Sequence, residues 1–184
     1  MNAPHSKTDL IERLTHVQQG VVQTIEAIPS DELDVGRGET WSAAGYLKHL
    51  ILSVKPFAKA LAFPAEQLQR RFGLSDRPSR SYDELVAVYQ ARLDDGVRAE
   101  DYERITPVAY RMPEDVQDVK AYLLDTWKDS NNRLLDALNG WNDADLDRYR
   151  IPHPAIGTIT LREMLFFTLF HNTLHWNDIQ QAHI

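Results

Sequence analysis

Two histidines near the end of the chain have the spacing of metal ligands. His171 and His175 lie four residues apart in "LFHNTLHWNDIQ", residues 169–180, within an otherwise helical and mostly apolar run. Residues i and i+4 are neighbours on a helix surface, so both imidazoles can direct a ring nitrogen toward one point. Taken alone, such a pair is also explained by coincidence or by two hydrogen-bonded interface residues. A metal site would need a third ligand from another helix.

His49 is the best candidate for that third ligand. It lies in the apolar stretch "GYLKHLILS", where burial of an unpaired imidazole costs free energy. Gly45 and Ser53, four residues before and after it, are small and leave space beside the ring. By itself, His49 is better explained as a core histidine bonded to a carbonyl or hydroxyl. Together with the pair of histidines near the end of the chain, it favours a divalent-metal site. The chain has no Cys, so His, Asp and Glu are the strong ligands available.

Other polar residues are candidates for the surroundings of this site. Thr126, Ser130 and Asn131 interrupt the apolar stripe of one predicted helix, and could line a cofactor or substrate pocket that faces the metal. A small rotation of that helix would expose them instead. Asp178 follows His175 by three residues and could orient a ligand imidazole or act as a base. Solvent exposure is the alternative for Asp178.

Five helical segments, recognised by apolar residues three or four positions apart, must position these side chains. We expect an all-α fold in which four helices form a bundle and one segment is additional. Glu84 and Glu163 follow Ser81 and Thr160 by three residues, the spacing of a capping box, and we assign both to helix capping. The segments are residues 6–28, a helix that starts at Thr40 or Ser42 and bends or ends at Pro56, a helix from Ser81, residues 113–138, and a helix from Thr160 almost to the end of the chain.

Two long connections separate these segments. Residues 63–80 form a crossover long enough for helices two and three to run parallel, and a solvated loop explains its basic residues better than an anion site does. Residues 139–160 contain two prolines and Gly157, so we expect extended backbone and a turn. His153, between the two prolines, is interpreted as a loop element rather than a fourth ligand. The basic residues of the crossover are Arg70, Arg71, Arg77 and Arg80.

Composition narrows the class of protein. The 184 residues fit a single domain, residues 1–184. The formal net charge of −7 repels a phosphate backbone, so we expect no nucleic-acid partner. No apolar run approaches the ~20 residues that span a bilayer, and the N-terminal stretch lacks the apolar core of a signal peptide. We therefore expect a cytoplasmic protein without a membrane partner.

The order of the motifs resembles that of a known family. The stretch "TWSAAGYLKHL", then a long middle, then "IPHPAIGTITLREMLFFTLFHNTLHWNDIQ", is similar to the DinB/YfiT-like superfamily of small metal-binding four-helix-bundle proteins. The resemblance covers nearly the whole chain and rests on the order of the motifs. It implies a three-histidine metal site at His49, His171 and His175, a down-up-up-down bundle whose second and third helices are parallel, and a homodimer.

A site of three imidazoles leaves at least one position open on an ion such as Zn²⁺ or Ni²⁺. The resemblance implies a low-molecular-weight thiol, such as mycothiol or bacillithiol, as a second cofactor. We therefore expect a metal-dependent enzyme that activates a thiol, in S-transferase fashion, or water toward a small electrophilic substrate. Asp178 is the only base that we can nominate, which favours thiol transfer over hydrolysis. The alternative is a non-catalytic metal-binding or small-ligand-binding protein, related to stress, whose ion braces the bundle.

Overall fold

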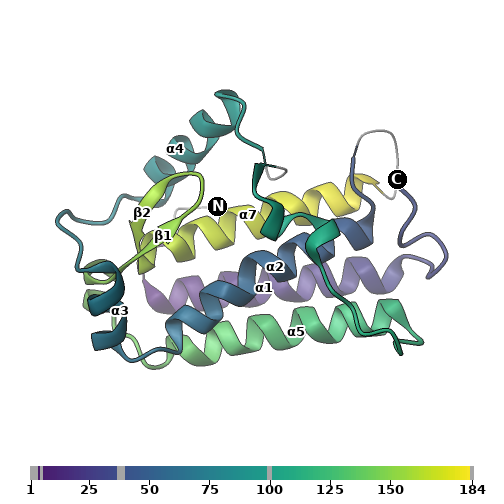
Figure 1. Cartoon of the computed structure of the whole chain (residues 1–184), viewed down its shortest axis with the longest axis horizontal. Helices are drawn as coiled ribbons and strands as arrows, with labels where there is room; N and C mark the ends of the chain where they lie inside the picture. Colours follow the sequence, from purple (N-terminus) through teal and green to yellow (C-terminus); the bar gives the residue numbers. More distant parts are fainter. Residues whose placement is uncertain (1–3, 5, 37–39, 99–100, 183–184) are drawn as a thin grey trace.

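Four long helices form the body of the molecule (Figure 1). The computed structural model describes residue 4 and residues 6–36, 40–98 and 101–182. Helix α2 packs against α5 and α7, and α1 packs against the same two helices, so α1 and α2 occupy opposite corners of the bundle. The predicted all-α four-helix bundle is confirmed. Its helices are α1 (Lys7–Ala27), α2 (Ala43–Leu61), α5 (Val119–Leu138) and α7 (Leu161–Ala182).

The directions of the helices follow from one long crossover. Figure 1 shows α1 and α7 running in one direction and the neighbouring helices α2 and α5 running in the other. This is the expected down-up-up-down order. Residues 62–118 carry the chain from the end of α2 back to the start of α5 and contain α3 (Ala65–Phe72), α4 (Tyr82–Asp94) and two 3₁₀ turns, η2 (Glu103–Ile105) and η3 (Pro107–Ala109). The sequence patterns predict no helix within residues 63–80, so α3 is an additional element.

Local capping sets where these helices start. Ser42 accepts a hydrogen bond from the N–H of Gly45 at 3.0 Å, and the capping box of Ser81 and Glu84 is present. Helix α5 begins at Val119, and the expected start near Pro113 is wrong. The side chain of Asp118 accepts from the N–H of Ala121 at 2.9 Å, which marks the first turn later in the chain.

Helix α2 runs through a proline. Pro56 is exposed, and α2 continues past it to Leu61. Of the two outcomes expected at Pro56, a bend or the end of the helix, the second is wrong. A proline inside a helix removes one backbone hydrogen bond. The carbonyl left free by an exposed proline can bind water, and the residues that follow, Phe57 and Ala58, are buried in the core. Packing of this last turn therefore offsets the loss.

A short hairpin precedes the last helix. Strands β1 (Arg150–His153) and β2 (Gly157–Thr160) pair antiparallel, and Arg150 lies opposite Thr160. The extended backbone and turn expected here are present, and within the otherwise helical fold the extended residues pair as two short strands. Helix α6 (Asp143–Arg148) fills the rest of the connection. The hairpin thus leads the chain directly into α7, because Thr160 both ends β2 and caps the helix.

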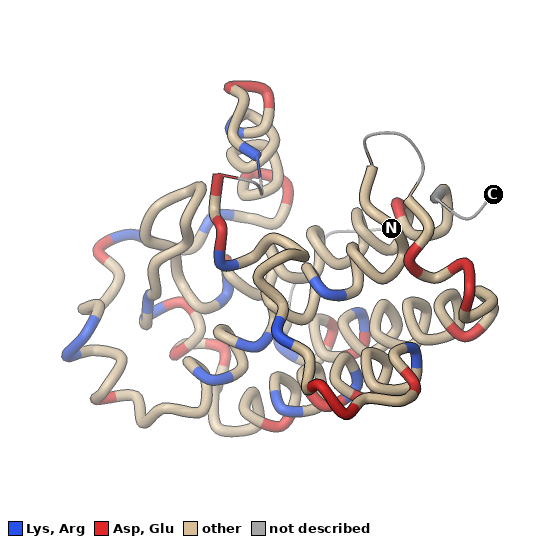
Figure 2. The backbone as a smooth tube through the Cα atoms, turned by 45° about the vertical axis from the view of Figure 1, so that its right-hand side comes forward, with Lys and Arg blue, Asp and Glu red and all other residues tan. Residues whose placement is uncertain are grey.

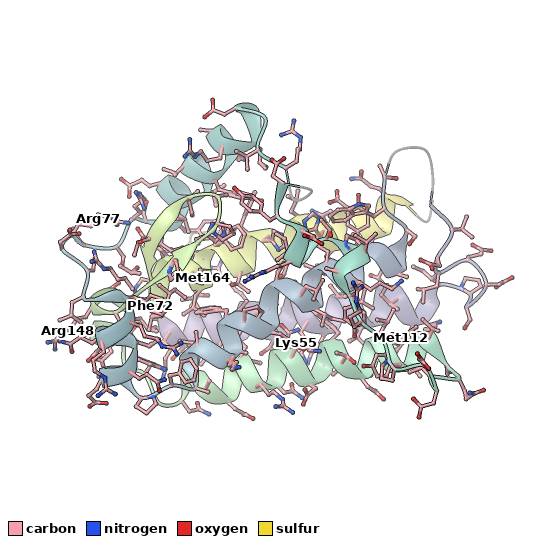
Figure 3. All side chains as sticks on the ribbon, viewed as in Figure 1. Lys55, Phe72, Arg77, Met112, Arg148 and Met164 are labelled. Carbon is pink, nitrogen blue, oxygen red and sulfur yellow. The ribbon has the colours of Figure 1, made fainter. Side chains whose placement is uncertain are left out.

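Glu163 ties the crossover to this helix start. Its backbone N–H donates to Thr160 Oγ1 at 3.1 Å, and the N–H of Thr160 donates to Glu163 Oε2 at 3.0 Å, as expected for a capping box. Arg77 also donates to both carboxylate oxygens, at 2.7 and 2.8 Å, and the backbone N–H of Arg80 donates at 2.8 Å. The basic crossover is therefore not a solvated loop at this point. Figure 3 labels Arg77 on it.

The buried face of each bundle helix contributes to one hydrophobic cluster. Leu14, Leu50, Trp127 and Leu165, one from each helix, are all buried in it. Charged residues of both signs are interspersed along the rest of the backbone (Figure 2). Within the described ranges, no helix has the length and apolar character needed to cross a membrane.

Candidate metal centre

Three histidines from two neighbouring helices meet near one end of the bundle. His49 projects from α2, and His171 and His175 project from α7. One ring nitrogen from each lies within 4.8 Å of the others. Their ring centroids are 4.5 to 4.9 Å apart. We call these three residues the histidine triad. The structure thus brings together all three residues that the sequence had proposed as metal ligands.

The rotation of α7 aims two of these rings at α2. Trp176, next to His175, packs against α1 at Gly20, where a Cβ atom would overlap the indole ring. The indole N–H donates to Thr24 Oγ1 at 2.9 Å. Glycine at this position therefore lets the indole fit between α1 and α7. With Trp176 turned toward α1, residues 171 and 175 face α2.

Hydrogen bonds fix how two of the rings present their nitrogens. Nδ1 of His49 lies 2.6 Å from the carbonyl oxygen of Ile105 in η2, and Nδ1 of His175 lies 2.8 Å from Oδ2 of Asp178. Both oxygens can only accept, so each Nδ1 carries the proton. The lone pair of each ring is therefore on Nε2. A backbone carbonyl or a carboxylate on the far nitrogen is the usual support of a metal-bound imidazole.

Burial keeps the deepest rings neutral. It lowers the pKa of His49 to about 4, with a further contribution from the nearby His175. It also lowers the pKa of the fully buried His171 well below the usual value, and the other two triad residues add to this effect. Neutral imidazole is the form that binds metals, so His49 and His171 are ready to ligate at neutral pH.

The protein alone leaves the triad incompletely bonded. Nε2 of His49 and Nε2 of His171 are 2.9 Å apart, and only one of them can donate to the other. Nδ1 of His171 is buried and has no hydrogen-bond partner within the described part of the chain. Two nitrogens each about 2.1 Å from one ion are about 3 Å apart when their bonds meet at a right angle. The donor set and its spacing therefore fit a first-row divalent cation such as Zn²⁺ or Ni²⁺.

Aromatic side chains surround the triad. The rings of Trp41 and Phe167 lie 5.0 Å from those of His49 and His171, respectively, and Tyr46 lies 5.4 Å from His175. The least buried member is His175, whose side chain is 15% exposed. Apolar walls limit water around the site, and solvent reaches it from the side of His175.

The other predicted site residues lie in two places. Asp178 contacts the triad through His175, in the geometry of an orienting carboxylate. Thr126, Ser130 and Asn131 lie on α5, which packs against α1 and α2, and each donates to a backbone carbonyl four residues earlier in its own helix. Their role in a pocket stays a prediction. The sequence missed the carbonyl of Ile105, since a backbone acceptor has no residue-type signal.

Comparison of the chain with models of protein families identifies its family. The model described as "DinB superfamily" matches residues 13–179, which include the triad and all four bundle helices except the ends of α1 and α7. The chain belongs to the DinB superfamily. This confirms the family suggested by the order of the sequence motifs. No curated protein matches the chain.

Two solved structures resemble this DinB-superfamily chain over almost its whole length. One is YfiT from Bacillus subtilis, described as "a probable metal-dependent hydrolase with an unusual four-helix bundle topology"; it has 16% sequence identity and a TM-score of 0.59, and the match covers 99% of this chain and 90% of YfiT. The other is the colibactin self-resistance protein ClbS, also 16% identical, with a TM-score of 0.61 and coverage of 98% and 97%. At this identity the likeness shows a shared fold.

The second structure corrects one expectation. ClbS was solved in complex with double-stranded DNA, so nucleic-acid binding is possible on this fold. The exclusion of nucleic acid from the net charge of −7 is therefore wrong as a general argument. Net charge averages over the surface, whereas phosphate contacts depend on a few local cations. The expected homodimer stays a prediction.

Proposed function

We propose that this DinB-superfamily chain is a metal-dependent enzyme whose ion is held by His49, His171 and His175. The observation that carries this proposal is the convergence of three imidazole nitrogens within 4.8 Å, in which two of the rings donate from their far nitrogen to fixed acceptors. Three protein ligands leave a coordination position for a water molecule or a substrate, which separates catalytic sites from closed structural sites. A divalent ion bound there would lower the pKa of a coordinated water or thiol and so supply a nucleophile at neutral pH.

The chain's own groups have defined tasks in this proposal. The carbonyl of Ile105 and the carboxylate of Asp178 hold the Nδ1 protons of His49 and His175, which keeps both Nε2 lone pairs directed inward. Trp41, Tyr46 and Phe167 exclude water from the flanks of the site. The substrate would be a small electrophile that enters from the side of His175.

Asp178 bears on the choice between water and thiol as nucleophile. Its Oδ2 is engaged by His175, so it serves better to orient a ligand than to take a proton from water. This favours activation of a low-molecular-weight thiol, which needs no separate base once coordinated. Hydrolysis is the second candidate because the structurally similar YfiT is described as a probable metal-dependent hydrolase. A cytoplasmic location would supply such a thiol.

The first experiment measures metal content by plasma mass spectrometry on untagged protein. We expect about one Zn²⁺ or Ni²⁺ per chain in the wild type and none in His49→Ala or His175→Ala, because two imidazoles hold an ion far more weakly than three. His16→Gln is a matched control that removes a histidine of α1 outside the triad. Wild-type protein that stays metal-free after addition of either ion would refute the site.

Product analysis then separates the nucleophiles. Metal-loaded protein would be incubated with a small electrophile such as monochlorobimane, with and without a thiol such as bacillithiol or mycothiol. A thiol adduct whose formation requires the triad supports S-transfer, whereas a water adduct supports hydrolysis. Stoichiometric metal without turnover of either kind would support the alternative, a non-catalytic protein whose ion braces the bundle.

A further inference from the structure

His153 is a buried histidine that the proposed metal site does not use. It lies in β1 and is 6% exposed. Its Nδ1 accepts hydrogen bonds from the backbone N–H groups of Ala155 at 3.2 Å and Ile156 at 3.3 Å. Because both partners donate, Nδ1 must hold the lone pair, and the proton of the neutral ring is on Nε2. The hairpin turn thus fixes the tautomer of this side chain.

The fixed tautomer gives His153 a single chemical capacity. Burial lowers the pKa of His153 to about 4, so the ring is neutral at physiological pH. It cannot act as a base through Nδ1, which is occupied by two donors. What remains is the Nε2–H group, and it has no hydrogen-bond partner among the described residues. Since Nε2 is not one of the fully buried atoms that lack a partner, this N–H can bond to water, and the acceptor of a ligand could replace that water.

The surroundings of His153 connect it to the triad. Its ring lies 4.2 Å from the ring of Phe167, and Phe167 stacks on His171 at 5.0 Å. Tyr89 of α4 contacts Phe167 at 5.0 Å and Phe170 at 6.1 Å. These three aromatic rings are only partly buried. They form an apolar wall of rings packed edge to face between α4, the hairpin and α7, with a triad member at one edge and His153 at another.

We propose that His153 and the wall of Tyr89, Phe167 and Phe170 bind the organic part of the substrate beside the metal, and that they select a planar aromatic or conjugated group with a neutral acceptor such as a carbonyl oxygen. The inference rests on the proposed function, since it names the substrate class for that site. Nε2–H of His153 donates to the acceptor, and the planar group lies against the aromatic rings.

The charge distribution argues for a neutral acceptor rather than a carboxylate. Arg92 is a cation bonded to the hairpin turn that holds His153. Its Nε donates to the carbonyl of Ala155, and its guanidinium lies 3.7 Å from Asp95. It is therefore already engaged away from the ring of His153. A carboxylate placed on a neutral donor between aromatic rings would lose hydration without gaining an ion pair. A carbonyl oxygen needs only the one hydrogen bond that His153 offers.

Two probes of similar size test the proposal. Acetophenone has a planar ring with a carbonyl acceptor, and ethylbenzene is similar in size without the acceptor. Each would be titrated into ¹⁵N-labelled full-length protein, and binding followed at the amide resonances of Ala155 and Ile156 and at the Nε2–H resonance of His153. We expect acetophenone to shift all three and to bind more tightly than ethylbenzene.

His153→Asn is the decisive variant. Asn Oδ1 can replace Nδ1 as acceptor for the turn, whereas the variant lacks a donor at the position of Nε2. We expect its amide spectrum and metal content to match the wild type and its affinity for acetophenone to fall about fivefold, the typical value of one hydrogen bond, while ethylbenzene is unaffected. His16→Asn, a matched change on α1, should alter neither probe.

Several results would overturn the inference. Equal affinities of the two probes, an acetophenone affinity that survives His153→Asn, or an Nε2 proton that responds to neither probe because it contacts only the Phe167 ring would each do so. Running the titrations with Zn²⁺ and with a chelator separates this failure from that of the proposed function. Discrimination between the probes without any metal binding would leave a ligand site and refute the metalloenzyme.

Discussion

Two buried polar clusters share helix α7, and they are built in opposite ways. The first surrounds Glu163 in the opening turn of α7, and the second is the histidine triad two turns later. Both oxygens of Glu163 accept hydrogen bonds, from a guanidinium and from backbone N–H groups, although the side chain is 0% exposed. In the triad, Nε2 of His49 lies 2.9 Å from Nε2 of His171, where at most one of the two can donate, and Nδ1 of His171 has no partner among the described residues.

The difference teaches how to tell a structural polar cluster from a binding site. A buried group whose hydrogen bonds are all made within the protein has nothing left to offer a ligand. A buried group with unmet capacity is costly, and persists where function requires it. By this criterion the Glu163 cluster fastens the crossover to the bundle, whereas the triad keeps unmet bonding capacity that the proposed ion would use.

The largest effect should come from breaking the satisfied cluster. Glu163→Gln removes the charge that Arg77 and Arg80 neutralise, and leaves a partly buried guanidinium without its partner. We expect the free energy of unfolding to fall by about 3–5 kcal/mol. Urea denaturation measures it, and Glu12→Gln on the exposed face of α1 is the control. A loss no larger than that of the control would contradict the assignment of Glu163 as a structural anchor.

Acid should reduce stability in two pH ranges, the first set by buried histidines and the second by Glu163. The pKa values of His49 and His153 are about 4 in the fold, below the usual 6.5, so the unfolded chain binds more protons between these values. Stability of the metal-free protein should therefore fall as the pH drops from 6.5 to 4, by about 1.4 kcal/mol per pH unit for each proton taken up.

Glu163 contributes in the lower part of the scale. Burial alone would raise its pKa, but hydrogen bonds from Arg77, Arg80 and Thr160 lower it below 4.5, so its stabilisation is present above that value and is lost on further acidification. Denaturation of chelator-treated protein at pH 7, 5.5 and 4.5 measures the first range. His153→Asn should reduce the slope there. An unfolding free energy that is constant down to pH 4.5 would be inconsistent with neutral buried imidazoles.

The carboxylate behind His175 should affect the ion and not the fold. Asp178→Asn replaces the acceptor for Nδ1–H by a weaker one, and we expect metal affinity to fall about 10- to 100-fold. Competition with a chromophoric chelator measures this affinity. Asp125→Asn, on the exposed side of α5, should leave it unchanged. Equal affinities in both variants would mean that the contact of His175 with Asp178 does not orient a ligand.

The smallest change in stability should come from the triad itself. His171→Leu should abolish metal binding and yet leave the metal-free protein as stable as the wild type, or more stable by about 1 kcal/mol, because an unsatisfied buried ring is replaced by an apolar side chain of similar size. Unfolding in the presence of a chelator measures it. A loss as large as that of Glu163→Gln would remove the contrast between the two clusters.

Sequence patterns predicted the triad because helical spacing is regular. The step of four residues from His171 to His175, and the isolation of His49 among apolar neighbours, both report on side chains that share a helix face. The same periodicity predicted the bundle helices, and the Ser81 and Thr160 capping boxes placed two helix starts within a residue. These are local signals, and the structure follows them.

The remaining features depend on contacts between distant parts of the chain. Nothing near Ile105 marks its carbonyl as a partner of His49, 56 residues away. The sequence predicts a solvated side chain for Arg77, because its partner, Glu163, lies 86 residues later in the chain and no local pattern links the two. The start of α5 was misplaced because Pro113 and Asp118 are both acceptable helix starts, and tertiary packing decides between them.

The position of the triad in the chain has a consequence for stability. His49 and His171 are separated by 122 residues, and they come from the second helix and the last helix. An ion shared between them would close most of the polypeptide into a loop in the folded state. Unlike a disulfide, this cross-link would open on unfolding, because the separated imidazoles lose the ion, so it would stabilise the fold through the binding free energy of the ion. The unfolding midpoint of this cysteine-free chain would therefore rise with the concentration of free metal, which the midpoint of a chain closed by a covalent bridge does not do.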